Sequence, residues 1–164
     1  MKKLLFTSII ALFAMCSMNA QTFKIGGSVG LPMGDASDFY SFTLGADVYY
    51  YFTDIDDLIE IGGTAGFRNF FAKDFEVAGQ TIEGEDAQFL PVAAAARIKL
   101  FGLFSGGIDL GYAIGLTDGL DGGLYFRPVI SFDIADTIEL LASYENISDD
   151  GSIGNLNVGV LFQL

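Results

Sequence analysis

Apolar and polar residues alternate along most of the chain after residue 20, and clusters of Gly, Asp and Ser interrupt the alternation. The last ten residues, NLNVGVLFQL, show the pattern plainly, with Leu156, Val158, Val160, Phe162 and Leu164 at every second position. A period of two residues predicts a β-strand with one apolar face. Eight such segments can be counted: 22–31, 40–52, 58–68, 88–100, 104–116, 124–134, 137–146 and 155–164.

Two all-β architectures fit this alternation. A soluble barrel turns its apolar face inward, whereas an outer-membrane barrel turns it toward lipid and fills its interior with the polar face. The segments have about 10 to 13 residues, close to the 9 to 11 that a tilted strand needs to cross a bilayer. Their polar face is rich in Gly and small residues, which suits a narrow interior. Aromatic residues stand near segment ends on the apolar face, as membrane-interface girdles require: Phe42, Phe52, Phe67, Phe104, Phe126, Phe132 and Tyr144. The sequence therefore predicts an all-β fold, an eight-stranded antiparallel up-and-down transmembrane β-barrel.

The links between segments alternate in length, which predicts an orientation. Links 32–39, 69–87, 117–123 and 147–154 are long and are expected outside the cell, while 53–57, 101–103 and 135–136 are short, as periplasmic turns are. The longest link, 69–87, is the best candidate for recognising something outside the cell.

Two prolines test the strand phase. The stretches FLPV and FRPV look alike, yet the alternation places Pro91 inward and Pro128 outward. Because proline cannot donate to a ladder and tends to mark bulges, we expect the phase to be wrong near one of them.

The N-terminus predicts a secretory signal peptide over residues 1–20, followed by the barrel domain over 21–164. Lys2 and Lys3 precede an apolar run that is too short to span a bilayer, and Ala20 ends a small, polar stretch. Cys16 follows the bulky Met15, which disfavours a lipoprotein. Cleavage would remove the single cysteine and change the formal net charge from −13 to −15. Such a chain repels nucleic acid, yet its mean hydropathy of +0.46 is high for so acidic a protein.

The chemistry available to the chain argues against catalysis. It has no histidine, and without Cys16 it has no thiol, so the usual zinc ligands and the usual base for a serine nucleophile are missing. No catalytic, cofactor-binding or metal-binding residue is predicted, and no cofactor. The acidic links would suit calcium, but neither TDGLDGG nor SDDGS has the full spacing of a calcium loop. We expect a non-enzymatic protein; a lipid-acting enzyme with a carboxylate-only site is a remote alternative.

The inward-facing charges form the most informative set. They are Lys24, Asp47, Glu60, Arg68, Arg97, Lys99, Asp109, Arg127, Asp133, Glu139 and Glu145. Each is costly in a narrow interior unless it is paired, so one interpretation is an ion-pair network that fills the lumen. The other is the lining of a narrow porin-like channel for ions or small solutes. An eight-stranded interior is only wide enough for side chains, which favours the filled lumen.

The chain resembles the porin-family, OmpA-like or OmpX-like small outer-membrane barrels of Bacteroidetes. The resemblance is carried by KIGGSVGLPMGDASDFYSFTLGADVYYYF, by NAQ at the cleavage region and by the closing NVGVLFQL. It implies that Asn157, Gly159, Phe162 and Leu164 form a C-terminal assembly signal, Leu164 replacing the commoner phenylalanine.

The resemblance also implies a place and partners. We expect the outer membrane of a Gram-negative bacterium, with its lipid, the barrel-assembly machinery and periplasmic chaperones as partners. The expected role is envelope integrity or surface interaction through the extracellular loops, which would hold any extracellular ligand.

Overall fold

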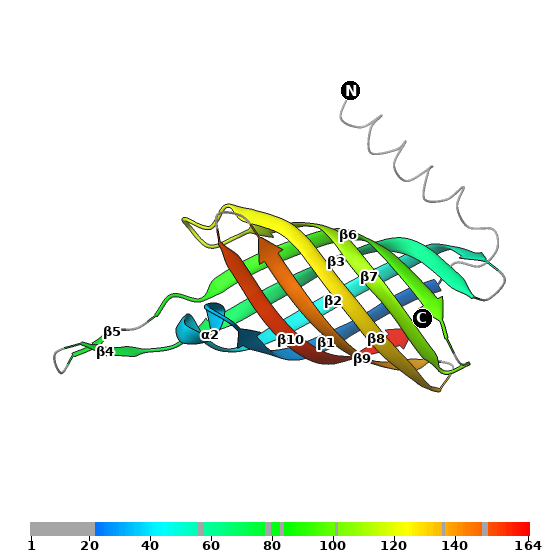
Figure 1. Ribbon diagram of the computed structural model, residues 1–164, viewed down its shortest axis with the longest axis horizontal. Helices are drawn as coiled ribbons and strands as arrows, with labels where there is room; N and C mark the ends of the chain where they lie inside the picture. Colours follow the sequence, from blue (N-terminus) through cyan, green and yellow to red (C-terminus); the bar gives the residue numbers. More distant parts are fainter. Residues whose placement is uncertain are drawn as a thin grey trace, which may run out of the picture.

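The computed structural model describes residues 22–55, 58–77, 80–82, 84–100, 102–135, 137–148 and 151–164, and the predicted signal peptide lies outside them. These residues form a closed barrel of eight antiparallel strands, each paired with its neighbours in the chain (Figure 1). The predicted eight-stranded up-and-down barrel is confirmed. The barrel strands are β1 (Thr22–Met33), β2 (Tyr40–Ile55), β3 (Ile59–Ala72), β6 (Ala87–Lys99), β7 (Phe104–Gly115), β8 (Gly122–Ala135), β9 (Ile138–Ser148) and β10 (Ser152–Gln163).

The last strand closes the barrel by pairing with the first, from Lys24 opposite Gln163 to Met33 opposite Gly154. Following directly opposed partners once around the barrel from Phe23 leads back to β1 at Met33, ten residues further along the strand. This stagger tilts every strand against the barrel axis, as closure requires. Closure also leaves none of the eight strands with an unpaired edge.

The alternation of residues sorts the side chains into an apolar outer wall and a mostly polar lumen. In β9 the positions alternate between buried and exposed along almost the whole strand, with Glu139, Leu141, Ser143, Glu145 and Ile147 buried. Large apolar side chains are exposed on the outside of every barrel strand. A contiguous apolar exterior of this extent is typical of a surface that meets lipid.

Both prolines keep the strand phase, so the expectation of an error near one of them is wrong. Pro91 is buried in the lumen, and Pro128 lies on the outer wall, as the plain alternation places them. The register between β3 and β6 is the same on both sides of Pro91, and so is the register between β8 and β9 around Pro128. Each proline interrupts a few pairs on one side of its strand without inserting a residue.

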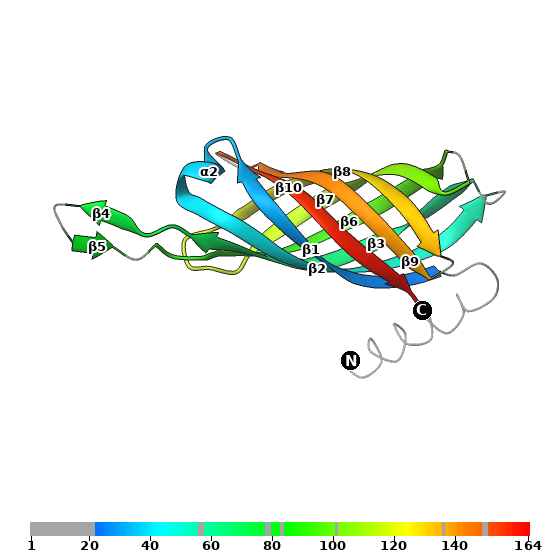
Figure 2. The same cartoon turned by 90° about the horizontal axis from the view of Figure 1, so that it is seen from below.

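The two ends of the barrel differ. One end, which we call the hairpin end, carries the long links and helix α2 (Ala36–Phe39). From this end the hairpin of β4 (Phe75–Val77) and β5 (Gln80–Ile82) projects far beyond the barrel (Figures 1 and 2). The terminal end carries the short links and the C-terminus (Figure 2). None of the described helices is long and apolar enough to cross a membrane.

The links at the hairpin end hold more secondary structure than the sequence predicted. β3 runs to Ala72 rather than ending at Arg68, and β4 pairs with β5 inside the link expected at 69–87. β1 likewise continues to Met33 before α2 begins. Three-residue strands are too short to show an alternation, which explains why the sequence pattern passed over β4 and β5.

Candidate functional site

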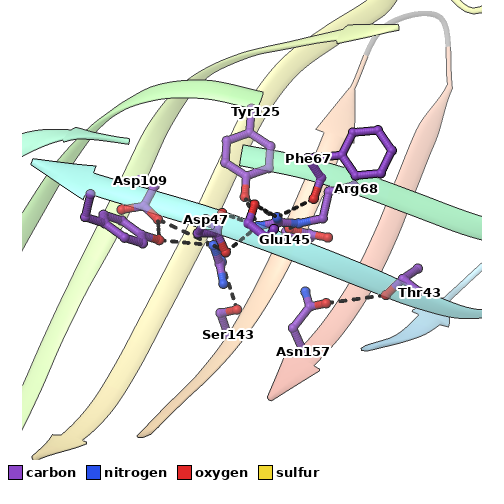
Figure 3. A network of polar contacts seen from close by, with 12 residues as sticks. Thr43, Asp47, Phe67, Arg68, Asp109, Tyr125, Ser143, Glu145 and Asn157 are labelled. Carbon is purple, nitrogen blue, oxygen red and sulfur yellow. Dashed lines mark hydrogen bonds and ion pairs between the residues drawn. The ribbon is translucent and has the colours of Figure 1, made fainter. Parts of the chain in front are cut away.

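The centre of the lumen is filled by arginine–carboxylate pairs. Arg68 on β3 is fully buried; its Nε donates to Glu145 Oε2 at 2.9 Å and its Nη2 donates to Asp47 Oδ1 at 2.9 Å (Figure 3). Its Nη1 donates to the carbonyl oxygen of Phe67 at 3.0 Å, so every nitrogen of the guanidinium has an acceptor. Burying a charge this deeply is tolerated only when it is paired and hydrogen-bonded in this way.

Two further arginines extend the pairs across the lumen. Arg127 Nη1 donates to Asp47 Oδ2 at 3.1 Å, and Arg127 Nε donates to Ser143 Oγ at 2.9 Å. Arg97 Nη1 donates to Asp109 Oδ1 at 2.7 Å. Asp47 therefore serves Arg68 and Arg127 at once, and the arginine and carboxylate charges balance. We call this set the central cluster: Asp47, Arg68, Arg97, Asp109, Arg127 and Glu145.

Tyrosines and amides complete the central cluster. Tyr49 Oη donates to Asp109 Oδ2 at 2.8 Å, and Tyr125 Oη donates to Glu145 Oε2 at 3.0 Å. Asn155 Nδ2 donates to the other oxygen of Glu145 at 2.8 Å. The sequence prediction named only the charged members. Tyr49, Tyr125 and Asn155 occupy the same alternate positions of their strands as the inward-facing residues, so the two-residue period also places these three polar side chains in the lumen.

Glycines make room for the arginines. A Cβ at Gly45 would lie 2.8 Å from Arg68 Nη1 and 2.6 Å from Ser28 Oγ. A Cβ at Gly107 would lie 2.5 Å from Arg97 Cδ and 2.1 Å from the carbonyl oxygen of Ala96. Gly45 and Gly107 are therefore part of the lumen packing, because a side chain there would displace an ion-paired arginine.

A second group of charges lies at the terminal end. Lys24 Nζ donates to Glu139 Oε2 at 2.7 Å and lies 3.6 Å from Glu60 Oε2, while Lys99 Nζ lies 3.4 Å from Glu60 Oε1. We call Lys24, Glu60, Lys99 and Glu139 the terminal cluster. These four residues and Asp133 line a cavity of about 340 Å³. Among the described residues Asp133 forms no ion pair, so it is the one predicted inward charge that stays outside both clusters.

Along β9, apolar side chains lie between the two clusters and beyond the central cluster. Along β9 the lumen residues run from Glu139 in the terminal cluster through Leu141 to Glu145 in the central cluster and then Ile147. Leu141 belongs to a buried layer with Tyr49, Tyr51, Ala95, Val129 and Leu161. Ile147 belongs to a second layer at the hairpin end, with Phe70, Ala87, Phe89, Ala93, Ala113 and Tyr125. The sequence prediction of a small, polar lumen missed these layers.

The surface at the hairpin end is acidic. Its described acidic residues are Asp35, Asp38, Asp74, Glu85, Asp86, Asp118 and Asp121, while the Glu76 and Glu83 side chains and Asp149 and Asp150 lie outside the described part. The Asp86 carboxylate accepts hydrogen bonds from Asn69 Nδ2 at 3.0 Å and from the Ala72 amide at 2.9 Å, so it holds the link in place. Within the described residues, no cluster of carboxylates could hold a metal ion.

Of the residues predicted to form a C-terminal assembly signal, three lie on the two faces of β10 and Leu164 directly follows the strand. Asn157 is buried and accepts a hydrogen bond from Asn155 Nδ2 at 2.8 Å. Gly159 packs against β1, where a Cβ would lie 2.6 Å from the carbonyl oxygen of Gly27. Phe162 is exposed on the outer wall, and the Leu164 amide donates to the carbonyl oxygen of Phe23 at 2.9 Å. Their role in assembly stays a prediction.

Comparison with known proteins identifies the class of fold. No family model matches the chain, and no curated protein sequence matches it either. Ail of Yersinia pestis is similar in structure, with a TM-score of 0.59 and 17% identity over 88% of this chain and 97% of Ail. The N-terminal β-barrel domain of Pseudomonas aeruginosa OprF gives a TM-score of 0.56 and 12% identity over 87% and 97%. A de novo designed transmembrane β-barrel gives 0.55 and 10% over 90% and 98%. The structural neighbours are thus small transmembrane barrels, including outer-membrane proteins, and at these identities the likeness concerns the fold alone.

Proposed function

We propose that this protein is a non-enzymatic outer-membrane barrel that supports the envelope or makes surface interactions through its hairpin end, which we place outside the cell. The observation that carries the proposal is the contrast between a blocked lumen and an elaborated end. The central cluster and the two apolar layers occupy the lumen, whereas the hairpin end projects β4 and β5 beyond the wall. Binding residues lie disproportionately on loops that a rigid scaffold positions.

The filled lumen speaks against a porin-like channel. The lumen holds the buried Arg68–Asp47 and Arg127–Asp47 pairs and the buried side chains of Phe70 and Phe89, which leave little room for a water path. Separating buried ion pairs is costly because each charge would lose its partner inside a narrow interior.

Catalysis is not part of the proposal. The charged groups at the centre of the lumen are buried and paired with one another, so they offer no accessible nucleophile and base side by side.

Ail has also been solved in complex with the heparin analogue sucrose octasulfate, which is a polyanion. The acidic hairpin end of this chain makes a polyanion an unsuitable ligand, because like charges repel. A surface interaction of this protein therefore calls for a partner of another chemistry.

Planar-bilayer recording tests the proposal. The purified barrel is expected to give no steady unitary conductance. A reproducible conductance that disappears when Gly45, beside Arg68, is replaced by leucine would favour the channel instead.

Deletion of the projecting link tests the role of the hairpin end. Residues 74–84 are replaced by a short turn, so that Asn69 and Asp86 keep their contacts. We expect a variant that still folds, since the deleted residues lie outside the closed barrel. The variant should no longer support the envelope or make the surface interaction. A heat-dependent shift on a detergent gel checks folding. Full retention of envelope resistance and surface binding would contradict a role for β4 and β5.

A further inference from the structure

A small pocket with an apolar floor opens at the hairpin end. It encloses about 290 Å³, and its floor is formed by the buried side chains of Phe89 and Ile147. Leu120 and Ile153 form its walls together with the backbone of Gly119 and its neighbours. The volume lies just below the roughly 300–1,000 Å³ of small-ligand pockets, so it suits one apolar side chain or a group of that size.

The pocket is held open by fixed structure. Its floor belongs to the apolar layer that caps the barrel. The link that carries Leu120 is anchored, because Thr117 Oγ1 donates to the carbonyl oxygen of Asp86 at 3.0 Å and accepts from the Gln88 amide at 3.0 Å. Gly119 has a φ of 85°, a left-handed conformation that favours glycine and that turns the link over the pocket. A ligand would therefore meet a preformed site, which lowers the entropic cost of binding.

Carboxylates lie on one side of this pocket and in the hollow next to it. Asp121 lines it directly. A second hollow of about 160 Å³ shares Gly119 and Leu120 with it and is lined by Glu85, Asp86 and Asp118. Neither hollow is lined by a lysine or an arginine among the described residues. The basic residue of this end is Lys73, whose Nζ donates a hydrogen bond to the carbonyl oxygen of Ser37 at 2.6 Å.

We infer that the hairpin end binds a cationic polypeptide that places one apolar side chain in the pocket of Phe89, Leu120, Ile147 and Ile153 and sets basic residues against the neighbouring carboxylates. This inference rests on the proposed surface function and names its partner class. Charge complementarity supports it, since an acidic surface attracts a basic partner and repels acidic ones. The two hollows share a wall, so the ligand needs an apolar group and a cation close together. A basic residue next to a leucine or phenylalanine in a peptide supplies this combination.

A short peptide tests the inference directly. The full barrel is placed in phosphatidylcholine nanodiscs and titrated with acetyl-Lys-Lys-Phe-Lys-Lys-amide, with empty nanodiscs as the control. The chain contains no tryptophan, so Gly151→Trp places a single fluorescent reporter at the edge of the pocket, where a Cβ meets no atom within 4 Å. Phe23→Trp at the terminal end is the matched control. We expect saturable fluorescence changes with Gly151→Trp and none with Phe23→Trp.

Changes to the peptide and to the protein separate the two contributions. Replacing the peptide's phenylalanine by alanine should weaken binding about tenfold, because the burial of one aromatic side chain is lost. Replacing its lysines by glutamates should abolish binding. In the protein, the double variant Asp118→Asn and Asp121→Asn should weaken binding about fivefold and flatten its salt dependence. The gel shift on heating confirms that each variant is folded.

The outcomes are distinct. The inference would be overturned if the affinity did not change on replacing the peptide's phenylalanine, on raising the salt concentration or on substituting Asp118 and Asp121. Equal affinity for the glutamate peptide would also overturn it. An alkylammonium ion that binds as tightly as the peptide would replace the polypeptide by a small amine. A silent bilayer with no peptide binding would refute this partner class and leave the surface function standing. A reproducible conductance would overturn the filled lumen of the proposed function, whereas peptide binding or its absence decides this partner class separately.

Discussion

The central and terminal clusters both pair cations with carboxylates inside the lumen, but they use different cationic residues. In the central cluster the cations are arginines whose side chains are 0–3% exposed, whereas in the terminal cluster they are lysines whose side chains are 10% and 30% exposed. An arginine presents several donors in a fixed plane, so Arg68 contacts Asp47 and Glu145 directly at the same time. A lysine is a compact, strongly hydrated charge, which suits the cavity of about 340 Å³ at the terminal end. The comparison indicates that the most deeply buried positions of the lumen hold arginine, whereas positions that face the cavity at the terminal end hold lysine.

Replacing Arg68 by methionine should have the largest effect. The substitution leaves the buried Glu145 without a cation and Asp47 with Arg127 alone, and removing one partner of a buried pair costs about 3–5 kcal/mol. Urea titration of the barrel in detergent micelles, followed by far-UV circular dichroism, measures the free energy of unfolding. Arg68→Lys is the matched control and should recover only part of the loss. A stability close to that of the wild type would show that the pairs are dispensable.

Arg127→Met should follow, with a loss about 1 kcal/mol smaller, because one guanidinium nitrogen has no acceptor to lose. Arg127 Nη2 has no hydrogen-bond partner among the described residues, whereas all nitrogens of Arg68 have one. Asp47 would still be paired with Arg68. The same urea titration ranks the two variants. The reverse order would mean that Arg127, and not Arg68, is the main support of the central cluster.

Lys24→Met should cost only about 1–2 kcal/mol, because Glu139 and Glu60 face the cavity and can be hydrated. The loss should shrink at high salt, which screens partly exposed charges better than buried ones. Thermal unfolding at low and high salt measures this difference. Lys99→Met, at the more exposed lysine, should change stability by less than about 0.5 kcal/mol. An effect of Lys24→Met as large as that of Arg68→Met would remove the distinction between the clusters.

Much of the fold could be predicted from the sequence because residue alternation is a local property. The eight strands, their order and the inward or outward direction of most side chains follow from a period of two residues. The alternation was also right at Pro91 and Pro128, where the general tendency of proline to mark bulges argued for an error. The β4 and β5 pair was missed because strands of three residues carry too little pattern.

The sequence by itself determined which charges enter the lumen, and the tertiary structure decided which of them meet. Arg68 pairs with Asp47, 21 residues away, and with Glu145, 77 residues away, and nothing in the local sequence selects these partners. The selection comes from closure: the ten-residue stagger between Phe23 and Met33 sets the relative height of every strand and brings side chains of one level together. The same closure gathers Phe89, Leu120, Ile147 and Ile153 around one pocket, because residues far apart in the chain share a level only once the sheet has become a ring.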